Sequence, residues 1–246
     1  MTDPSRRVTV GVDGCKAGWV AVTARADIAA LEMKVYSAFA DIVAASPDNA
    51  VIAVDMPIGL PEKIGAAGRG PEKLVRTFLG DRQSSVFSIP ARGAVEQHDY
   101  REACRMALET SDPPRKVSKQ AFHLFPKIRE IDALVSIEPA LHSRVIECHP
   151  EFAFWRLNDG QAMALPKKIK GRVNLAGMEE RKHCLHAAGV QRAFLDQAPP
   201  KGTGADDCLD ATAVLLIAMR FARGEAISFP SPPGRDTHGV PIAIWC

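Results

Sequence analysis

The sequence of 246 residues has little net charge, no clustered cysteines and no long apolar run. Lys and Arg total 31 against 29 Asp and Glu, so a formal charge of +2 creates no overall attraction to an acidic polymer. No stretch approaches the ~20 apolar residues that span a bilayer. The first residues enter a strand-like run without the apolar core and cleavage site of a signal peptide. We therefore expect a cytoplasmic protein that does not bind a membrane.

The cysteines are scattered along the chain, without a CxxC pair or a spacing suited to zinc. In a reducing cytosol such residues usually serve as small buried hydrophobes, so we expect no disulfide framework. The 46% of hydrophobic residues gives ample material for a core. Because no repeat, low-complexity tract or linker divides the chain, we predict a single domain over residues 1–246. The oligomeric state stays open, with a homodimer among the options.

Three short β-branched runs open the chain, at residues 8–13, 19–23 and 31–36. Such strands with tight connections, before any long helical pattern, predict an antiparallel meander at the start of a mixed sheet. The apolar runs 50–54 and 144–148 are typical of strands buried on both faces. The fold class is therefore α/β, a mixed sheet flanked by helices.

Helical patterns fill the stretch between the last two of these strands. We expect helices at 71–79, 99–108 and 118–135, with Pro126 kinking or dividing the third. They form an inserted helical region at about 62–140. The chain should close as a hairpin with strands at 227–228 and 240–245 around the turn Pro232-Pro233-Gly234.

Carboxylates recur where the predicted strands end. Asp13 ends the first strand, Asp55 the fourth and Glu147 the fifth. In open α/β sheets, ligands usually bind in the crevice at the carboxyl ends of the strands. We therefore expect these three side chains to contribute to one site.

Three further acids, Asp206, Asp207 and Asp210, open a predicted helix at 205–223. Their spacing of three and four places them on one helix face, where like charges repel unless a hard cation lies between them. Mg²⁺ and Mn²⁺ prefer carboxylate oxygens, and two such ions can hydrolyse a phosphodiester through an activated water. The residues after Asp210 are almost wholly apolar, so an unpaired carboxylate there would carry a desolvation cost. The acids together predict a Mg²⁺ or Mn²⁺ site.

Four of these acids also have an ordinary structural interpretation when each is taken alone. Asp206 and Asp207 suit the first turn of a helix capped by Thr203. Asp13 suits a turn and Asp55 the cap of an irregular segment. The combination, rather than any single acid, favours a shared site.

A phosphate-backbone substrate would require cations around these acids. One run gives four positive charges in six residues: Lys167, Lys168, Lys170 and Arg172. A second group follows Asp55: Arg69, Arg76, Arg82 and Arg92. The alternative is a solvated surface whose charges never converge. The candidates for substrate contact are Lys16, Arg82, Lys119 and Lys168.

Six motifs carry a family resemblance: GVDGCKAGW (11–19), DMPIGLP (55–61), DRQSSVF (81–87), SKQAFHLFPKIREID (118–132), ECHPEFAFW (147–155) and DDCLDA (206–211). This series resembles the family called domain of unknown function 429, regarded as predicted nucleases with a ribonuclease H-like fold. The resemblance implies a five-stranded mixed sheet whose first three strands are antiparallel. Carried over from ribonuclease H-like nucleases, the catalytic metal-binding acids become Asp13, Asp55, Asp207 and Asp210, with Glu147 and Asp206 as additional metal ligands.

Three functions are compatible with this pattern. The first is a Mg²⁺- or Mn²⁺-dependent hydrolase, a nuclease acting on DNA or RNA. The second is an ATP-binding phosphoryl-transfer protein of the actin-like or sugar-kinase type, whose sheet also starts with an aspartate before a Gly-containing turn. Such proteins normally need two such domains, and this chain is too short for the duplication. The third is a non-catalytic nucleic-acid-binding module. The acid pattern favours the nuclease.

Overall fold

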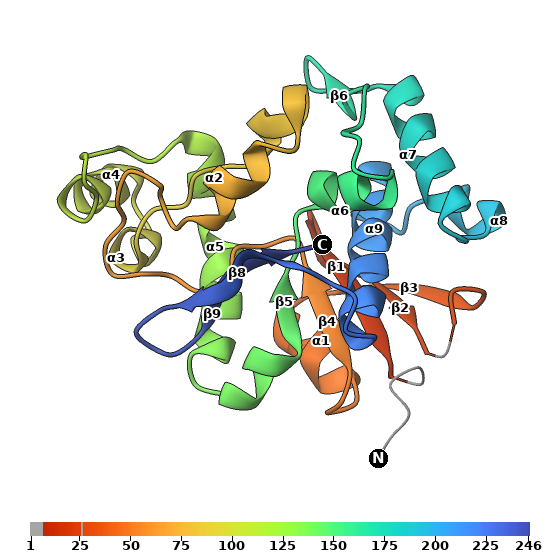
Figure 1. Cartoon of the computed structure of the whole chain (residues 1–246), viewed down its shortest axis with the longest axis horizontal. Coiled ribbons are helices and arrows are strands. Elements are labelled where there is room, and N and C mark those ends of the chain that lie inside the picture. The colour runs from red at the N-terminus through yellow and green to blue at the C-terminus, as the bar shows by residue number, and fades with distance from the viewer. Residues whose placement is uncertain (1–6, 26) are drawn as a thin grey trace.

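The computed structural model describes residues 7–25 and 27–246, and a mixed sheet of seven strands lies at its centre (Figure 1). The strand order is β3-β2-β1-β4-β5-β9-β8. The strands are β1 (Thr9–Cys15), β2 (Gly18–Ala24), β3 (Leu31–Tyr36), β4 (Val51–Val54), β5 (Val145–Glu147), β8 (Ser228–Arg235) and β9 (Pro241–Trp245). Strands β1 to β3 form an antiparallel meander, and β1, β4, β5 and β9 are parallel neighbours. The predicted α/β class and the meander are confirmed.

The sheet is larger than the five strands that we expected because the C-terminal hairpin joins its edge beside β5. The predicted turn of this hairpin was wrong. Pro232-Pro233-Gly234 lies inside β8, and the chain reverses at Asp236–Val240 instead. The Asp236 carboxylate accepts hydrogen bonds from the backbone N–H groups of His238 and Val240, both at 2.9 Å, which fixes the turn.

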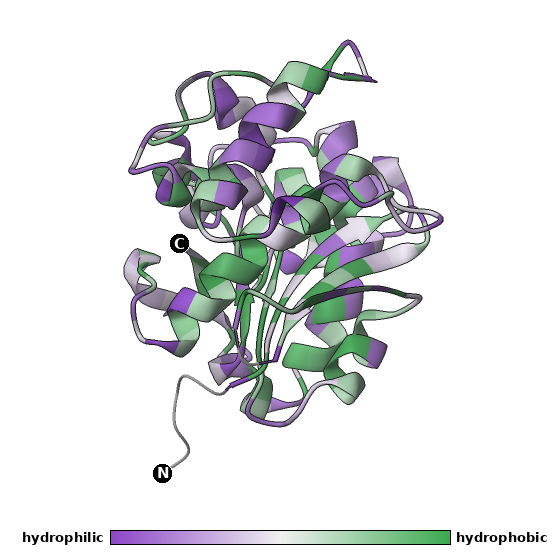
Figure 2. Ribbon diagram, turned by 90° about the vertical axis from the view of Figure 1, so that its right-hand side faces the viewer, coloured by the Kyte–Doolittle hydropathy of each residue, from purple (hydrophilic) through white to green (hydrophobic). Residues whose placement is uncertain are grey.

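Helices cover both faces of the sheet. They are α1 (Phe39–Ala45), α2 (Pro71–Arg76), α3 (Arg92–Val95), α4 (Tyr100–Glu109), α5 (Lys119–Val135), α6 (Pro150–Leu157), α7 (Leu175–Ala187), α8 (Arg192–Leu195) and α9 (Ala205–Ala222), together with the 3₁₀ helices η2 (Gly80–Ser85) and η3 (Pro139–Ser143). Helices α9, α6 and α7 pack in the core on one face, and α1 and α5 in the core on the other. Figure 2 shows hydrophobic residues along the sheet and hydrophilic residues on the outer helices and loops.

Helix α5 continues through Pro126, so of the two alternatives that we predicted, a kink or a division, the division into two helices does not occur. The proline ring is exposed, while Phe125 and Ile128 on either side of it are fully buried in the core. This packing holds both halves of the helix in place although one backbone hydrogen bond is lost.

A short hairpin of β6 (Lys168–Ile169) and β7 (Arg172–Val173) stands apart from the main sheet and contains the predicted basic run. No helix in residues 7–25 and 27–246 is long and apolar enough to cross a membrane. Residues 1–6, where we expect no signal peptide, lie outside the described residues.

Helix α9 lies directly on β1 because Gly11 has no side chain. A Cβ atom at Gly11 would lie 2.1 Å from the carbonyl oxygen of Ala211 and 2.2 Å from the backbone nitrogen of Leu215. Only glycine permits so close an approach. The contact sets the helix against the strand just before Asp13 and thereby positions the N-terminal turns of α9.

Candidate functional site

Asp13 and Asp55 are neighbours on two adjacent parallel strands, β1 and β4. Asp55 directly follows β4, but the prediction that Asp13 ends the first strand was wrong, because β1 continues to Cys15 through its pairing with β2. The pairing of β1 with β4 places Val12 opposite Val54, and the backbone N–H of Asp55 donates to the carbonyl of Val12 at 2.9 Å. Asp13 follows Val12 and Asp55 follows Val54, so the two aspartates lie side by side. Because side chains alternate along a strand, both carboxylates belong to the face that α9 covers.

Asp210 comes to the same place from α9. It precedes Ala211, whose carbonyl faces Gly11, and its side chain is buried, with 4% of the residue exposed. Its Oδ2 atom accepts a hydrogen bond from the ammonium of Lys167. Its Oδ1 atom is buried and has no hydrogen-bond partner among the described residues. We call Asp13, Asp55 and Asp210 the acid cluster.

Burial and the charges of neighbouring carboxylates raise the pKa values of all three carboxyls of the acid cluster. Burial, followed by the charge of Asp55, raises the pKa of Asp13 well above its ordinary value. Burial and the neighbouring Asp210 raise the pKa of Asp55 to about 8. Burial raises the pKa of Asp210 to about 6, against the opposing effect of Lys167. The cluster therefore holds protons near neutral pH unless more positive charge is supplied.

Lys167 is the cation that enters this cluster. Burial alone would lower its pKa, but the charges of Asp210 and Glu151 outweigh burial and raise it. The sequence places Lys167 in a basic run, but nothing in the run indicates which of its cations turns inward. We did not predict Lys167 as a site residue.

Asp206 and Asp207 lie at the edge of the acid cluster and have partners of their own. Asp206 forms an ion pair of 2.5 Å with Lys168, whose side chain is half exposed. Asp207 Oδ2 accepts the backbone N–H of Gly204 at 2.8 Å, as a carboxylate in the first turn of a helix does. Burial raises the pKa of Asp207. Of the three acids in α9, Asp206 and Asp207 thus have partners outside the acid cluster, and Asp210 is the one that belongs to it.

Glu147 lies on the opposite face of the sheet from the acid cluster. Its partner in β4 is Val54 rather than Asp55, so the register differs by one residue and the side chain faces the other way. Glu147 accepts hydrogen bonds from the guanidinium of Arg69 at 2.7 Å and the backbone N–H of Ile58 at 2.8 Å. Burial raises the pKa of Glu147 to about 7 in spite of Arg69. Glu147 nevertheless lines the same cavity as Asp13 and Asp55, and its charge raises the pKa of Asp55, although its oxygens are held by Arg69 and Ile58.

Glu151 is a further buried carboxylate close to the acid cluster, and we did not predict it. It lies in the first turn of α6, is buried, and is held by Arg181 through two hydrogen bonds of 2.6 and 2.8 Å. Its charge acts on Asp55, Asp210 and Lys167. Sequence analysis missed this residue because a glutamate after His149-Pro150 also suits an ordinary helix start.

The predicted substrate-binding cations lie at different places around the site. Lys16 is exposed in the turn between β1 and β2, and Lys119 is exposed at the start of α5. Arg82 is half-buried in η2. Lys168 contacts an acid of the site through its ion pair with Asp206. Lys127 of α5, which we did not select, lies 4.2 Å from the ring centre of Trp19, and the charge of Asp13 acts on it.

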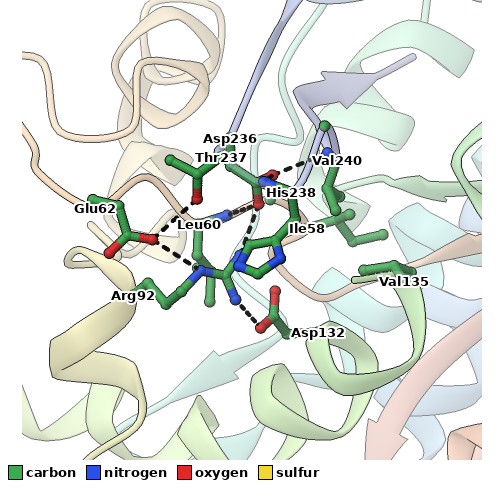
Figure 3. Close-up of polar contacts among 12 residues, drawn as sticks. Ile58, Leu60, Glu62, Arg92, Asp132, Val135, Asp236, Thr237, His238 and Val240 are labelled. Carbon is green, nitrogen blue, oxygen red and sulfur yellow. Dashed lines mark hydrogen bonds and ion pairs between the residues drawn. The ribbon is translucent and has the colours of Figure 1, made fainter. Parts of the chain in front are cut away.

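Arg92, one of the arginines that follow Asp55, stabilises the fold and does not reach the acid cluster. Arg92 is buried and donates to Asp236 at 2.8 Å, and it also pairs with Asp132 (Figure 3). Asp236 accepts the backbone N–H of Leu60 at 3.0 Å as well. This network joins the loop after β4 to α5 and to the C-terminal turn. Arg92 is therefore committed to fixing the loop that follows Asp55.

The fit of these residues to a divalent metal rests on their donor chemistry. Within residues 7–25 and 27–246, no three His, Cys, Asp or Glu side chains form a group arranged to hold a metal ion. The contacts explain why, since Lys167 occupies one oxygen of Asp210 and Asp207 turns to Gly204. The donors themselves suit Mg²⁺ or Mn²⁺, because the acid cluster consists of carboxylates and the Oδ1 atom of Asp210 is buried without a partner in the described part of the chain.

The fold and the site define an α/β protein with buried carboxylates at the carboxyl edge of a mixed sheet. The sequence profile of the family described as "Protein of unknown function (DUF429)" matches residues 11–235. The chain belongs to this family, and the match includes the whole acid cluster. No curated protein and no solved structure is detectably similar to the chain.

Proposed function

We propose that this protein is a divalent-metal-dependent nuclease of the ribonuclease H-like type, which hydrolyses phosphodiester bonds of DNA or RNA. The acid cluster is the observation that carries the proposal. Asp13, Asp55 and Asp210 are crowded together, and burial together with the charges of neighbouring carboxylates raises the pKa values of all three. A protein gains nothing in stability from such an arrangement, so a ligand that carries positive charge accounts for it better.

The topology gives a second line of support. Strands β3-β2-β1-β4-β5 carry acids on the first strand, directly after the fourth strand and on the last helix. This is the placement that ribonuclease H-like nucleases use for their metal ligands.

The carboxylates of the acid cluster would hold the metal, with Asp206, Asp207 and Glu151 at its edge. Bound Mg²⁺ or Mn²⁺ would supply the Lewis acid that phosphodiester hydrolysis needs. Arg181 keeps Glu151 in position through its two hydrogen bonds. Lys127 lies near Asp13 and offers an ammonium group to a phosphate that approaches the cluster.

A cleavage assay tests this function directly. Single-stranded DNA, duplex DNA and RNA are each incubated with the protein in Mn²⁺, in Mg²⁺ and in EDTA. We expect cleavage in the presence of metal, and a loss of at least about a hundredfold in Asp13→Asn and Asp210→Asn. Asp48→Asn, at an exposed acid in the turn before β4 and so at the opposite end of that strand from Asp55, is the matched control and should retain activity. Metal-dependent turnover of ATP without cleavage of nucleic acid would favour the phosphoryl-transfer alternative.

We infer a cytoplasmic location from the cysteines. All of them are buried free thiols: Cys15, Cys104, Cys148, Cys184, Cys208 and Cys246. Thiols of this kind persist in a reducing compartment. Cell fractionation with an antibody to the protein tests the location, and recovery in an exported fraction would contradict it.

A further inference from the structure

The hairpin of β6 and β7, residues 168–173, projects from the molecule, and we call it the ribbon. Its two strands form a sheet of their own, and all six of its residues are exposed. Figure 1 shows β6 at the margin of the molecule, next to α7. The ribbon begins directly after Lys167, whose ammonium pairs with Asp210 of the acid cluster. A two-stranded hairpin is only marginally stable by itself, so a contact with a partner explains this exposed ribbon better than stability does.

The base of the ribbon is held by α7. The backbone N–H of Asn174 donates to the carbonyl of Lys167 at 2.8 Å, and its side-chain amide donates to the carbonyl of Pro166 at 2.8 Å. Gly177 of α7 permits this close approach, because a Cβ atom there would lie 2.2 Å from the carbonyl oxygen of Pro166. These contacts fix the direction of the ribbon and leave its tip exposed.

The turn at the tip has the geometry of a tight hairpin. Ile169 pairs with Arg172, so Lys170 and Gly171 form a two-residue turn, and their φ angles are 51° and 75°. Positive φ at both central residues is typical of a type I′ turn, whose twist matches that of the strands. The cations of the ribbon therefore have defined positions relative to one another.

Cations lie on both faces of the ribbon and at its tip. Residues paired across two strands share a face, so Lys168 and Val173 lie on one face, and Ile169 and Arg172 on the other. Lys170 occupies the turn. The apolar side chains of Ile169 and Val173 are about half exposed. A flat anionic surface such as a membrane would contact one of these faces, whereas a groove between two anionic strands contacts both.

The major groove of duplex DNA has the dimensions to accept the ribbon. The groove is about 12 Å wide and about 8.5 Å deep and admits a two-stranded β-ribbon. At about 3.4 Å per residue, the ribbon extends about 7 Å from Lys168 to the turn. Duplex RNA has a narrow major groove that side chains do not enter, and single strands are commonly bound by stacking on aromatic side chains. Residues 168–173 include no aromatic residue, so duplex DNA fits the ribbon best.

We propose that the ribbon inserts into the major groove of duplex DNA, where Lys168, Lys170 and Arg172 contact phosphates of the two strands. Because the ribbon begins beside the acid cluster, a duplex that it holds lies next to those carboxylates. The proposal rests on the nuclease function and deepens it, because it names duplex DNA as the substrate.

The first experiment measures binding of a short fluorescent DNA duplex by anisotropy in EDTA, so that neither a metal nor cleavage is involved. Lys170→Asn removes a charge at a position where asparagine tolerates the positive φ, and Arg172→Gln removes a second charge. In the double variant we expect the affinity at low salt to fall at least about tenfold. The slope of log affinity against log salt should fall by about 2.

The matched control removes two exposed charges of α4, which lies far from β6 in Figure 1. Arg101→Gln combined with Arg105→Gln should keep the wild-type affinity and salt dependence. A ribbon double variant that binds the duplex as the wild type does would overturn the proposal.

A further variant keeps every charge and tests the geometry of the ribbon. Gly171→Val places a β-branched side chain on a residue with a φ of 75°, which opposes the turn. None of the described residues has an atom within 4 Å of the new Cβ, so the melting temperature of the protein should not change. We expect weaker binding of the duplex. Wild-type affinity in Gly171→Val would overturn insertion into the groove.

Competitors identify the partner. An unlabelled DNA duplex should displace the probe at least about tenfold more effectively than single-stranded DNA or an RNA duplex of the same sequence. Equal competition by either of these would overturn the assignment to duplex DNA. Vesicles of phosphatidylcholine and phosphatidylserine test a membrane as the partner. Ribbon-dependent binding to these vesicles without binding to DNA would also overturn the proposal.

Failure of the ribbon and failure of the nuclease function are distinguishable. Ribbon-dependent binding of duplex DNA in EDTA, without metal-dependent cleavage by the wild type, would reject the nuclease and keep the ribbon. Metal-dependent cleavage of duplex DNA with the same KM in the wild type and in the ribbon double variant would reject the ribbon and keep the nuclease.

Discussion

The ammonium group of Lys167 lies against Oδ2 of Asp210 at the point where the buried acids meet. The lysine comes from the segment before β6, and the aspartate from the second turn of α9. Lys167 places a positive charge beside the carboxylate of Asp210, and a divalent ion bound to the acid cluster would place one there as well. The two cations therefore compete for the same carboxylate.

Replacing Lys167 should reveal this competition. Lys167→Met leaves the acid cluster without its nearest cation, so we expect the metal-free protein to lose about 1–3 kcal/mol of unfolding free energy. The affinity for Mn²⁺ should rise about tenfold, as measured by calorimetry. Lys170→Met, on the same hairpin but exposed, is the matched control. Weaker Mn²⁺ binding in Lys167→Met would mean that Lys167 supports the metal instead of opposing it.

Glu147 should behave as a structural residue. Its carboxylate is shared by Arg69 and the backbone of Ile58 on the face away from the acid cluster. Glu147→Gln should lower stability by about 2–3 kcal/mol both with and without Mn²⁺, because the buried guanidinium of Arg69 loses one of its two carboxylate partners and keeps only Glu72. The stabilisation by Mn²⁺ itself should be unchanged in thermal unfolding. If that stabilisation disappeared, Glu147 would belong to the metal ligands.

Gly11 should tolerate no side chain. Gly11→Ala places a Cβ atom against the backbone of Ala211 and Leu215, which cannot yield without moving α9 off β1. We expect a loss of about 3 kcal/mol or more, measured by urea denaturation. Gly65→Ala, where the nearest atom to the new Cβ is 4.0 Å away, should be nearly neutral. Equal effects of the two substitutions would contradict the close contact.

The acid cluster also predicts how stability depends on pH. The pKa of Asp55 rises from its ordinary value of 3.8 to about 8, so between these values the folded state holds a proton that the unfolded state has lost. Stability is therefore lost as pH rises. His149, whose pKa falls to about 4, acts in the opposite direction but only below about its ordinary 6.5.

The clearest window is therefore pH 6.5 to 8, measured in EDTA. There we expect the free energy of unfolding to fall by up to about 1 kcal/mol per pH unit, and Asp55→Asn to flatten this slope. Glu147, with a pKa of about 7, and Asp13, whose pKa is also raised, contribute to the slope in both proteins, so the variant should reduce the slope without abolishing it. A slope that is the same with and without Asp55 would show that its carboxyl is not perturbed.

The sequence predicts the meander, the strand ends and the acids because these depend on local patterns. Asp13, Asp55 and Asp210 could be found from their place after buried strands and beside apolar residues. The side of the sheet that Glu147 occupies depends on a register difference of one residue, which no local pattern encodes. The inward turn of Lys167 depends on the fold of a hairpin distant in sequence from β1 and β4. Both positions depend on packing between segments far apart in the chain, so local sequence patterns could not predict them.

The most direct test of the central claim is thermal unfolding of the wild type, Asp13→Asn and Asp210→Asn in EDTA and in Mn²⁺. If the acid cluster holds a divalent metal, Mn²⁺ raises the melting temperature of the wild type. Asp13→Asn melts higher than the wild type in EDTA, because repulsion among the carboxyls is relieved, whereas Asp210→Asn melts lower because it leaves the ammonium of Lys167 without its carboxylate partner. Both variants gain little from Mn²⁺. A wild type that Mn²⁺ does not stabilise, or variants that respond to Mn²⁺ as the wild type does, would contradict the claim.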